Sequence, residues 1–262
     1  ISADESLIVV PDKVVTGQHT EITFYALNAQ GVHLVTGGAS FTVALSPIRP
    51  SGNDVPVGVM DNSDGTYTAS FTVTTSGTFS LSALLGMDSL AGSPKTIAVG
   101  PGPTWAALTM VSGAGANAAT AGVPASMLIQ ARDEYGNPRT EGGDLFGLEV
   151  VEKLTGARVR SSVSDQGDGT YSVVYTVTSS GGYSVDLSMS QTVIAMPSTH
   201  IAVSPGVAHG PTSLARGFGL QSAVAGTTTE VSVWLKDLYG NTVTPDELLL
   251  QPVLTLADVT VP

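Results

Sequence analysis

Hydrophobic and polar residues alternate strictly over residues 66–73, and the hydrophobic positions of this pattern return over residues 170–177. One face of the first stretch carries Tyr67, Ala69, Phe71 and Val73, and the other face carries threonine and serine. In the second stretch the hydrophobic positions are Tyr171, Val173, Tyr175 and Val177. A period of two in aromatic and β-branched residues is typical of a strand with one buried face. The pattern therefore predicts two equivalent strands, each entered through an Asp-Gly turn that tolerates positive φ.

Further short strands of the same kind are predicted elsewhere in the chain, separated by turns rich in glycine, proline and asparagine. No window shows a sustained period of 3.6 residues, so little helix is expected. Short strands at a spacing of about ten residues predict an all-β fold of tandem immunoglobulin-like β-sandwiches with about seven strands each. The hydrophobic positions of these further strands are Ile22/Phe24/Ala26, Met127/Ile129/Ala131, Val231/Val233/Leu235, Phe41/Val43/Leu45 and Phe146/Leu148/Val150.

The chain repeats itself with a period of 104 residues. Asp64-Gly65-Thr66-Tyr67 recurs as Asp168-Gly169-Thr170-Tyr171, a shift of 168 − 64 = 104. Asp133-Glu134-Tyr135-Gly136-Asn137 is echoed by Asp237-Leu238-Tyr239-Gly240-Asn241 with the same shift. The first repeat has a weaker counterpart, Asn28-Ala29-Gln30-Gly31, offset by one residue. Two landmarks that share one period indicate a true structural repeat.

This period predicts three units, the last of them incomplete. They span residues 1–100, 101–204 and 205–262, and the sequence reaches Pro262 before a third Asp-Gly-Thr-Tyr element occurs. About half of the third unit is then expected to be missing, with a cut core unless its strands find partners elsewhere. The connecting segments Gly100-Pro101-Gly102-Pro103 and Ser204-Pro205-Gly206 are short and contain proline. Restrained neighbours are expected, because proline stiffens a linker.

The complete units resemble the filamin-type immunoglobulin repeat. The resemblance rests on Asp64-Gly65-Thr66-Tyr67 followed by Phe71, on Gly77-x-Phe79 and on Gly92-Ser93-Pro94, with matching residues in the second unit. Met196-Pro197 departs from the usual Ser-Pro. Partners of this family often add an extended peptide at the edge between the third and fourth strands, by β-augmentation. The resemblance thus implies contacts near Ser40, Thr42 and Ala44, or near Gly147, Glu149 and Val151.

Composition narrows the classes of partner. The net charge is −12 with a pI near 4.4 and no basic cluster, which argues against nucleic acid and anionic lipid. The absence of cysteine excludes disulfides and thiolate metal sites. No apolar run approaches the roughly 20 residues of a membrane span, so direct membrane insertion of this segment is not expected. The partners are therefore expected to be other proteins.

No catalytic set stands out, so we expect no enzyme, no cofactor, no metal and no small-molecule substrate. His19, His33, His200 and His209 lack any metal-ligand spacing. Asp61-x-Ser63-x-Gly65 lacks the bidentate glutamate of a calcium loop and is interpreted as a tight turn.

Trp234 is predicted on the outward face of its strand, between Val233 and Leu235. It either packs on a linker or on the missing half-repeat, or it is an exposed aromatic anchor for a partner.

These features favour a non-enzymatic scaffold segment of a larger cytoskeletal protein, located in the cytoplasm. The tail of an algal axonemal dynein heavy chain in a cilium is one setting for filamin-type repeats. The alternative is the ectodomain of a cell-surface adhesion protein, such as one on an algal gamete. A binding domain appended to an enzyme elsewhere in the same polypeptide is a third class.

Overall fold

The computed structural model describes residues 1–11 and 13–244 of the chain. Its first unit is a sandwich of two sheets. One sheet has the strand order β1-β3-β6-β5, and the other has β2-β9-β7-β4 with β8 paired to β7. The bounds are β1 Ser2–Val9, β2 Val14–Val15, β3 His19–Leu27, β4 Phe41–Arg49, β5 Gly58–Asp61, β6 Thr66–Thr72, β7 Gly77–Leu85, β8 Asp88–Ser89 and β9 Lys95–Gly100.

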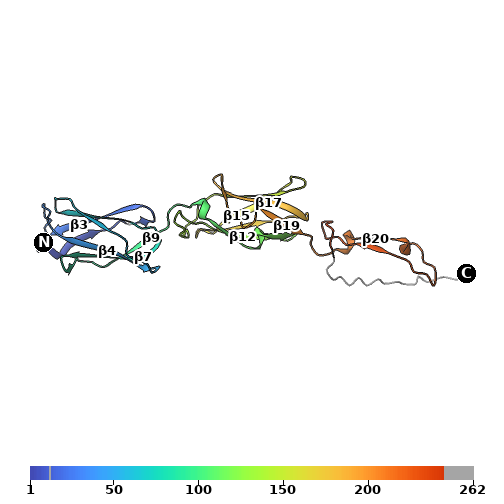
Figure 1. Cartoon of the computed structure of the whole chain (residues 1–262), viewed down its shortest axis with the longest axis horizontal. Coiled ribbons are helices and arrows are strands. Elements are labelled where there is room, and N and C mark those ends of the chain that lie inside the picture. Colours follow the sequence, from blue (N-terminus) through green and yellow to red (C-terminus); the bar gives the residue numbers. More distant parts are fainter. Residues whose placement is uncertain (12, 245–262) are drawn as a thin grey trace.

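The second unit repeats this arrangement. Its sheets have the orders β10-β12-β16-β15 and β11-β19-β17-β13-β14, with β18 paired to β17. The bounds are η1 Ala106–Leu108, β10 Met110–Ser112, η2 Ala114–Ala116, β11 Ala118–Thr120, β12 Ala125–Gln130, β13 Phe146–Glu152, β14 Arg158–Val159, β15 Ser161–Asp165, β16 Thr170–Tyr175, β17 Gly181–Met189, β18 Thr192–Ile194 and β19 His200–Ser204. The predicted all-β, immunoglobulin-like tandem is confirmed, and the units follow one another along the long axis of the molecule (Figure 1).

Each sandwich has its own core, and the alternating strands supply its centre. In β6, Tyr67, Ala69 and Phe71 point inward, and all three are buried. In β16 the same holds for Tyr171, Val173 and Tyr175. A period-two strand buries one face in this way because its side chains alternate between the sheet's two sides.

The tyrosine that opens each of these strands makes the same two contacts in both units. The Tyr67 ring packs on Phe41 with centroids 4.5 Å apart, and its hydroxyl accepts a hydrogen bond of 2.8 Å from the Ala39 N–H. The Tyr171 ring lies 4.6 Å from that of Phe146, and its hydroxyl accepts one of 2.9 Å from the Asp144 N–H. A buried tyrosine is favourable when its polar tip is satisfied in this manner.

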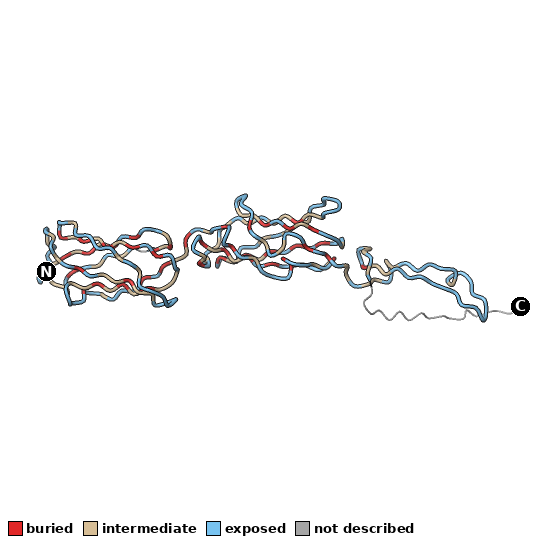
Figure 2. The backbone as a smooth tube through the Cα atoms, in the orientation of Figure 1, coloured by how far each residue is buried: buried red, intermediate tan, exposed pale blue. Residues whose placement is uncertain are grey.

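The described part of the third unit contains one two-stranded sheet and two short helical turns. Its elements are η3 Gly210–Thr212, β20 Leu214–Arg216, η4 Phe218–Leu220 and β21 Ser232–Trp234. Residues 245–262, which belong to the predicted incomplete third unit, lie outside the described residues. Exposed residues predominate here, whereas buried residues recur along the strands of the first two units (Figure 2).

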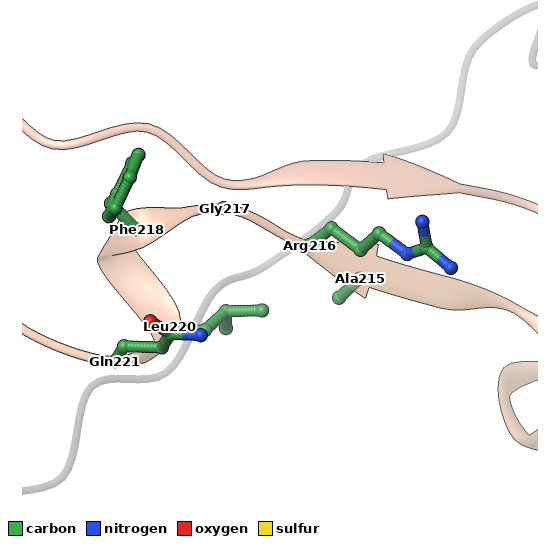
Figure 3. A pocket seen from close by; sticks show the side chains of 6 residues that line it. All are labelled: Ala215, Arg216, Gly217, Phe218, Leu220 and Gln221. Atoms are coloured by element: carbon green, nitrogen blue, oxygen red, sulfur yellow. The ribbon is translucent and has the colours of Figure 1, made fainter.

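The turn η4 leaves large apolar side chains uncovered. Phe218 is 82% exposed and Leu220 is 57% exposed. The two side chains leave the turn in different directions, and Ala215 lies on the Leu220 side (Figure 3). The equivalent of Leu220 in the second unit is Ala116, which is fully buried in that unit's core.

Candidate functional site

The joints between units contain buried polar side chains that recur with the period of the chain. Asp133 and Asn137 lie at the first joint, and Asp237 and Asn241 lie at the second. Both aspartates are almost completely excluded from solvent, with exposed fractions of 0% and 1%. We call each aspartate–asparagine pair a joint clamp. A buried carboxylate persists only when its oxygens are hydrogen-bonded, so the partners of these groups explain their position.

One oxygen of each aspartate organises its own turn. Asp133 Oδ1 accepts hydrogen bonds from the N–H groups of Tyr135 and Asn137, at 3.0 and 2.9 Å. Asp237 Oδ1 accepts the corresponding bonds from Tyr239 and Asn241, both at 2.9 Å. Aspartate favours such turns because its short side chain reaches the backbone two residues ahead.

The other oxygen holds the linker. Asp133 Oδ2 accepts a bond of 3.0 Å from the Gly102 N–H, and Asp237 Oδ2 accepts one of 2.8 Å from the Gly206 N–H. In both joints the connecting segment is therefore fixed to the unit that follows it.

The asparagine of each clamp reaches back to the preceding unit. The Asn137 amide donates to the Thr74 carbonyl at 2.9 Å and accepts from the Ser76 N–H at 2.9 Å. The Asn241 amide makes the same two bonds, at 2.8 Å to the Thr178 carbonyl and 2.9 Å from the Ser180 N–H. Two bonds from one planar amide fix orientation as well as distance.

A tyrosine from the same turn packs on a glycine of the preceding unit. The ring of Tyr135 covers Gly17, and the ring of Tyr239 covers Gly122. A Cβ added to either glycine would collide with the ring, and both glycines have positive φ, +77° and +80°. Only glycine allows both this backbone conformation and this close approach.

The first joint has additional polar contacts. The Thr16 hydroxyl donates to Asp133 Oδ2 at 2.6 Å and accepts from the Gly102 N–H at 2.8 Å. Arg139 Nη1 donates to the Gly102 carbonyl at 2.7 Å. At the second joint Ala121 and Val243 occupy the positions of Thr16 and Arg139, and neither has a polar side chain. The second joint therefore holds the same clamp with fewer supports.

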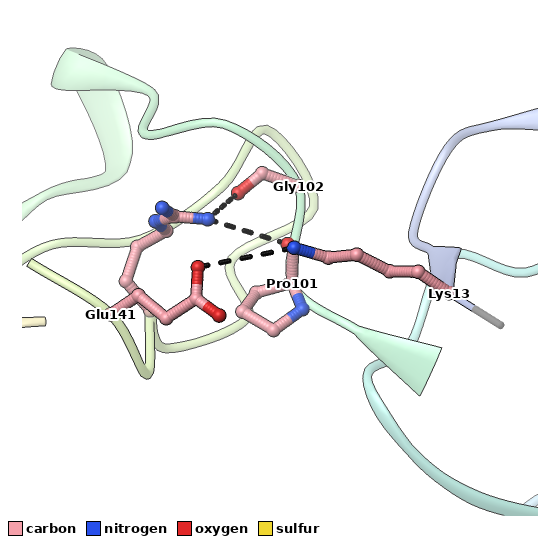
Figure 4. A network of polar contacts seen from close by, with 5 residues as sticks. Lys13, Pro101, Gly102 and Glu141 are labelled. Carbon is pink, nitrogen blue, oxygen red and sulfur yellow. Dashed lines mark hydrogen bonds and ion pairs between the residues drawn. The ribbon is translucent and has the colours of Figure 1, made fainter. Parts of the chain in front are cut away.

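An ion pair also crosses the first joint, between Lys13 and Glu141 at 3.9 Å (Figure 4). Both side chains are about two-thirds exposed or more. Exposed pairs of this kind contribute little to stability, so the buried hydrogen bonds dominate the joint.

Both buried carboxyls are held in their charged form. Burial raises the pKa of Asp133, but hydrogen bonds from Thr16, Asn137 and Gly102 outweigh it and leave this pKa below its ordinary value. Burial likewise raises the pKa of Asp237, and bonds from Asn241, Gly206 and Tyr239 bring it below the ordinary value. Hydrogen bonds to the ionised form favour that form.

The predicted strand-addition residues fall on or beside two sheet edges. Ser40 directly precedes β4, and Thr42 and Ala44 lie within it; β4 is the last strand of its sheet. Beyond β4 there is one isolated bridge, between Leu45 and Val55, among the described residues. Ser40 and Thr42 are exposed, and Ala44 is half-buried.

In the second unit β14 covers one end of the corresponding edge. Gly147, Glu149 and Val151 lie on β13, where Val151 pairs with Arg158 of β14. Glu149 forms an ion pair with Arg158, and Gly147 is exposed. An incoming strand therefore meets a shorter open edge in the second unit than in the first.

Trp234 lies on β21 and pairs across the strands with Leu214 of β20. Its side chain is 48% exposed. It faces the side opposite to Val233, because neighbouring residues of a strand point to opposite faces.

Sequence reasoning identified the Asp-x-Tyr-Gly-Asn turns but assigned them no role at the joints. The signal that could have revealed it is that the glycines of the two linkers, Gly102 and Gly206, are separated by the same 104 residues as the two turns. Asp61, in the turn interpreted as a partial calcium loop, instead accepts bonds from the Gly38 and Ser63 N–H groups.

Within residues 1–11 and 13–244, no group of histidine, aspartate and glutamate side chains is arranged to hold a metal ion. Over the same described residues, no helix has the length and hydrophobicity needed to span a membrane.

Comparison with known proteins identifies the repeat. The Filamin/ABP280 repeat family matches residues 3–96 and 103–205. The chain belongs to the filamin-repeat family. Filamin-C of Rattus norvegicus and of Mus musculus are each 32% identical to it over 151 residues. That match covers 58% of the chain but only 5% of either filamin, so the chain corresponds to a small part of these relatives.

Solved structures of bacterial surface proteins share the fold. The Escherichia coli adhesin FdeC superposes with a TM-score of 0.68 at 23% identity, over 91% of this chain and 75% of that one. InvD of Yersinia pseudotuberculosis gives 0.56 at 20% identity, over 93% and 73%. Invasin, a bacterial integrin-binding protein, gives 0.55 at 16% identity, over 78% and 40%.

Filamin repeats are structural modules without enzymatic activity. This filamin-repeat chain is accordingly a non-enzymatic protein-interaction module.

Proposed function

We propose that this filamin-repeat chain is a semi-rigid spacer that holds protein-binding edges at fixed positions within a larger protein. The observation that carries the proposal is the joint clamp, which occurs at two successive joints with the same three bonds across each boundary or to its linker. A spacer that transmits position or force needs restrained joints, and flexible linkers would not provide them.

Partner binding is proposed at the open sheet edges of β4 and β13. Unpaired main-chain groups on an edge strand accept an extended peptide, and side chains on alternate positions select it. We propose Ser40, Thr42 and Ala44 as the contact residues of the first unit. In the second unit the proposed contact residues are Gly147, Glu149 and Val151. There a peptide either displaces β14 or pairs only with the first part of β13, which β14 leaves open.

A lysine substitution on the edge tests this mode of binding. Ala44→Lys should abolish binding of a partner peptide to the first unit, because an edge lysine opposes strand addition. Ala98→Lys is the matched control, since Ala98 is exposed on β9, which has a neighbouring strand on both sides. Equal loss of binding in both variants would contradict edge recognition.

A cytoskeletal setting, including a ciliary axoneme, is the first proposal for where the spacer works. The filamin relatives support it. An antibody to this segment should recover the full-length protein with the detergent-resistant cytoskeletal or axonemal fraction.

The ectodomain of a cell-surface adhesion protein is the second candidate. It is favoured by the superposition on an adhesin over most of both chains. Labelling of the segment on intact, unpermeabilised cells, together with its removal by external protease, would establish the adhesion setting and contradict the cytoskeletal one.

A further inference from the structure

One outward-facing position carries a large side chain in every unit. This position is a pair of residues that face each other across two neighbouring strands, β1 and β3, β10 and β12, or β20 and β21. The pairs are Leu7 with Tyr25, Met110 with Gln130, and Leu214 with Trp234. The apolar members Leu7, Met110 and Leu214 are 53%, 56% and 46% exposed. Large apolar side chains on the solvent face of a sheet add nothing to the core, and their recurrence indicates a surface for contact.

In the third unit this position becomes a pocket. Leu214, Arg216, Trp234, Lys236 and Thr242 line a shallow depression of about 260 Å³. Leu214 and Trp234 provide the apolar wall, and Trp234 offers an aromatic face of the type enriched at interface hot spots.

Positive charge distinguishes this pocket from its equivalents. Arg216 and Lys236 flank Trp234, whereas the first unit has Val9 and Leu27 at these positions and the second has Ser112 and Arg132. The chain has only 10 lysine and arginine residues against 22 aspartate and glutamate residues. Within the described residues, neither Arg216 nor Lys236 forms an ion pair.

Both cations retain donors for a ligand. Lys236 Nζ donates one bond to the Gly240 carbonyl at 2.9 Å, which leaves two of its three N–H groups. The Arg216 side chain is extended, and its guanidinium lies clear of Phe218 and Leu220 (Figure 3). A planar guanidinium binds a carboxylate through two parallel bonds.

The strand beside the pocket is open. In the described part of the chain β20 pairs with β21 alone, so its other side presents unpaired main-chain groups. Such an edge pairs with an extended peptide, and a saccharide cannot continue the ladder in this way.

We propose that this surface, the Trp234 patch, binds an extended acidic peptide segment of a partner protein. The peptide lies along β20, places carboxylates on Arg216 and Lys236, and sets an apolar side chain on Trp234. This site is separate from the β4 and β13 edges, and its test does not depend on them.

The test uses the whole chain and the decapeptide Glu-Ser-Val-Ser-Glu-Ser-Val-Ser-Glu-Ser as the glutamate–valine probe. In an extended strand this probe presents glutamate and valine on the same face, as Arg216, Trp234 and Lys236 require. A Trp105→Phe background makes Trp234 the sole tryptophan, since the chain has two. Titration of the probe should change the Trp234 emission saturably. The paired substitution Arg216→Ser with Lys236→Gln should weaken binding at least about tenfold, because both charged partners of the carboxylates are removed.

Matched variants separate recognition from folding and from net charge. Trp234→Gln in the wild-type background gives the patch the residue that the second unit carries at Gln130, in a unit that folds with it. It should abolish binding of a fluorescently labelled probe in an anisotropy titration. Arg160→Ser removes an exposed positive charge from the second unit and should leave the affinity unchanged.

Three outcomes would overturn the proposal. The first is no saturable binding of the glutamate–valine probe. The second is equal binding of the lysine–valine counterpart. The third is that hyaluronan, an anionic saccharide without a peptide backbone, binds with the same dependence on Trp234 and Arg216, which would reassign the patch to acidic glycans.

Discussion

Asn137 and Thr74 lie 63 residues apart in the chain, yet the amide of one donates a hydrogen bond of 2.9 Å to the carbonyl of the other across a repeat boundary. Asn241 and Thr178 have the same separation and a bond of 2.8 Å at the next boundary. The second repeat contributes to both joints: its Asp133–Asn137 turn forms the clamp of the first, and the loop with Thr178 supplies the acceptor of the second. The same contact therefore recurs at both boundaries.

Removal of the clamp asparagine should uncouple neighbouring repeats. Asn137→Ala deletes both bonds to the first repeat and takes two amide donor contacts away from the buried Asp133. In chemical denaturation of the whole chain, we expect the interaction free energy between the first and second repeats to fall by about 1–3 kcal/mol. Asn53→Ala, in an exposed loop, is the control. Identical denaturation curves for the wild-type chain, Asn137→Ala and Asn53→Ala would contradict the role of Asn137 in coupling the repeats.

The first joint should be stiffer than the second, and exchanging the residues that differ between them should exchange their stiffness. Thr16→Ala with Arg139→Val gives the first joint the residues found at the second, Ala121 and Val243. This variant should broaden the inter-repeat distance distribution of the first joint while each repeat keeps its own melting transition. The reciprocal change, Ala121→Thr with Val243→Arg, should narrow the second joint. No change in either direction would mean that the clamp alone sets stiffness.

Acid should loosen the joints. The pKa of Asp133 and that of Asp237 are below their ordinary value in the folded chain. A lowered folded pKa stabilises the joint fully above the unfolded pKa of about 3.9, and this stabilisation is lost as the pH falls through the folded pKa. Inter-repeat distances should therefore remain constant at neutral pH and broaden below about pH 4.

Distance is the appropriate readout for this acid response. Asp64 and Asp168 also have lowered pKa values through bonds to Thr66 and Thr170, but these bonds lie inside single turns. Their titration should leave the spacing of repeats unchanged. Asp133→Asn should be loose at neutral pH already and show no further change at the first joint on acidification.

Each central tyrosine should matter mainly to its own repeat. Tyr67→Ala or Tyr171→Ala empties a site that is 1% or 0% exposed, which typically costs about 3–5 kcal/mol. Tyr→Phe at the same position removes only the hydroxyl and should cost about 1 kcal/mol. Calorimetry should show two transitions, of which the alanine variant lowers one strongly. A single transition that shifts as a whole would show that the joint couples the repeats completely.

Much of the fold could be predicted from sequence because it depends on local periodicity. The alternation from Tyr67 to Val73 identifies a half-buried strand, and the shift to Tyr171 identifies its copy. The joint could not be predicted in the same way. Asp133 has the same local sequence signal as any turn aspartate, and its burial depends on Thr16 and Gly102, which are distant in the chain.

The chain has no cysteine, so two introduced spin labels would be the only ones present. Met87 and Leu154 are 96% and 90% exposed, on the first and second repeats, and suit labelling after substitution by cysteine. Pulsed electron resonance should give one narrow distance distribution for the otherwise wild-type chain and a broad one when Asn137→Ala and Asp133→Ala are added. A broad distribution already present with the clamp intact, or one unaffected by its removal, would contradict the semi-rigid spacer.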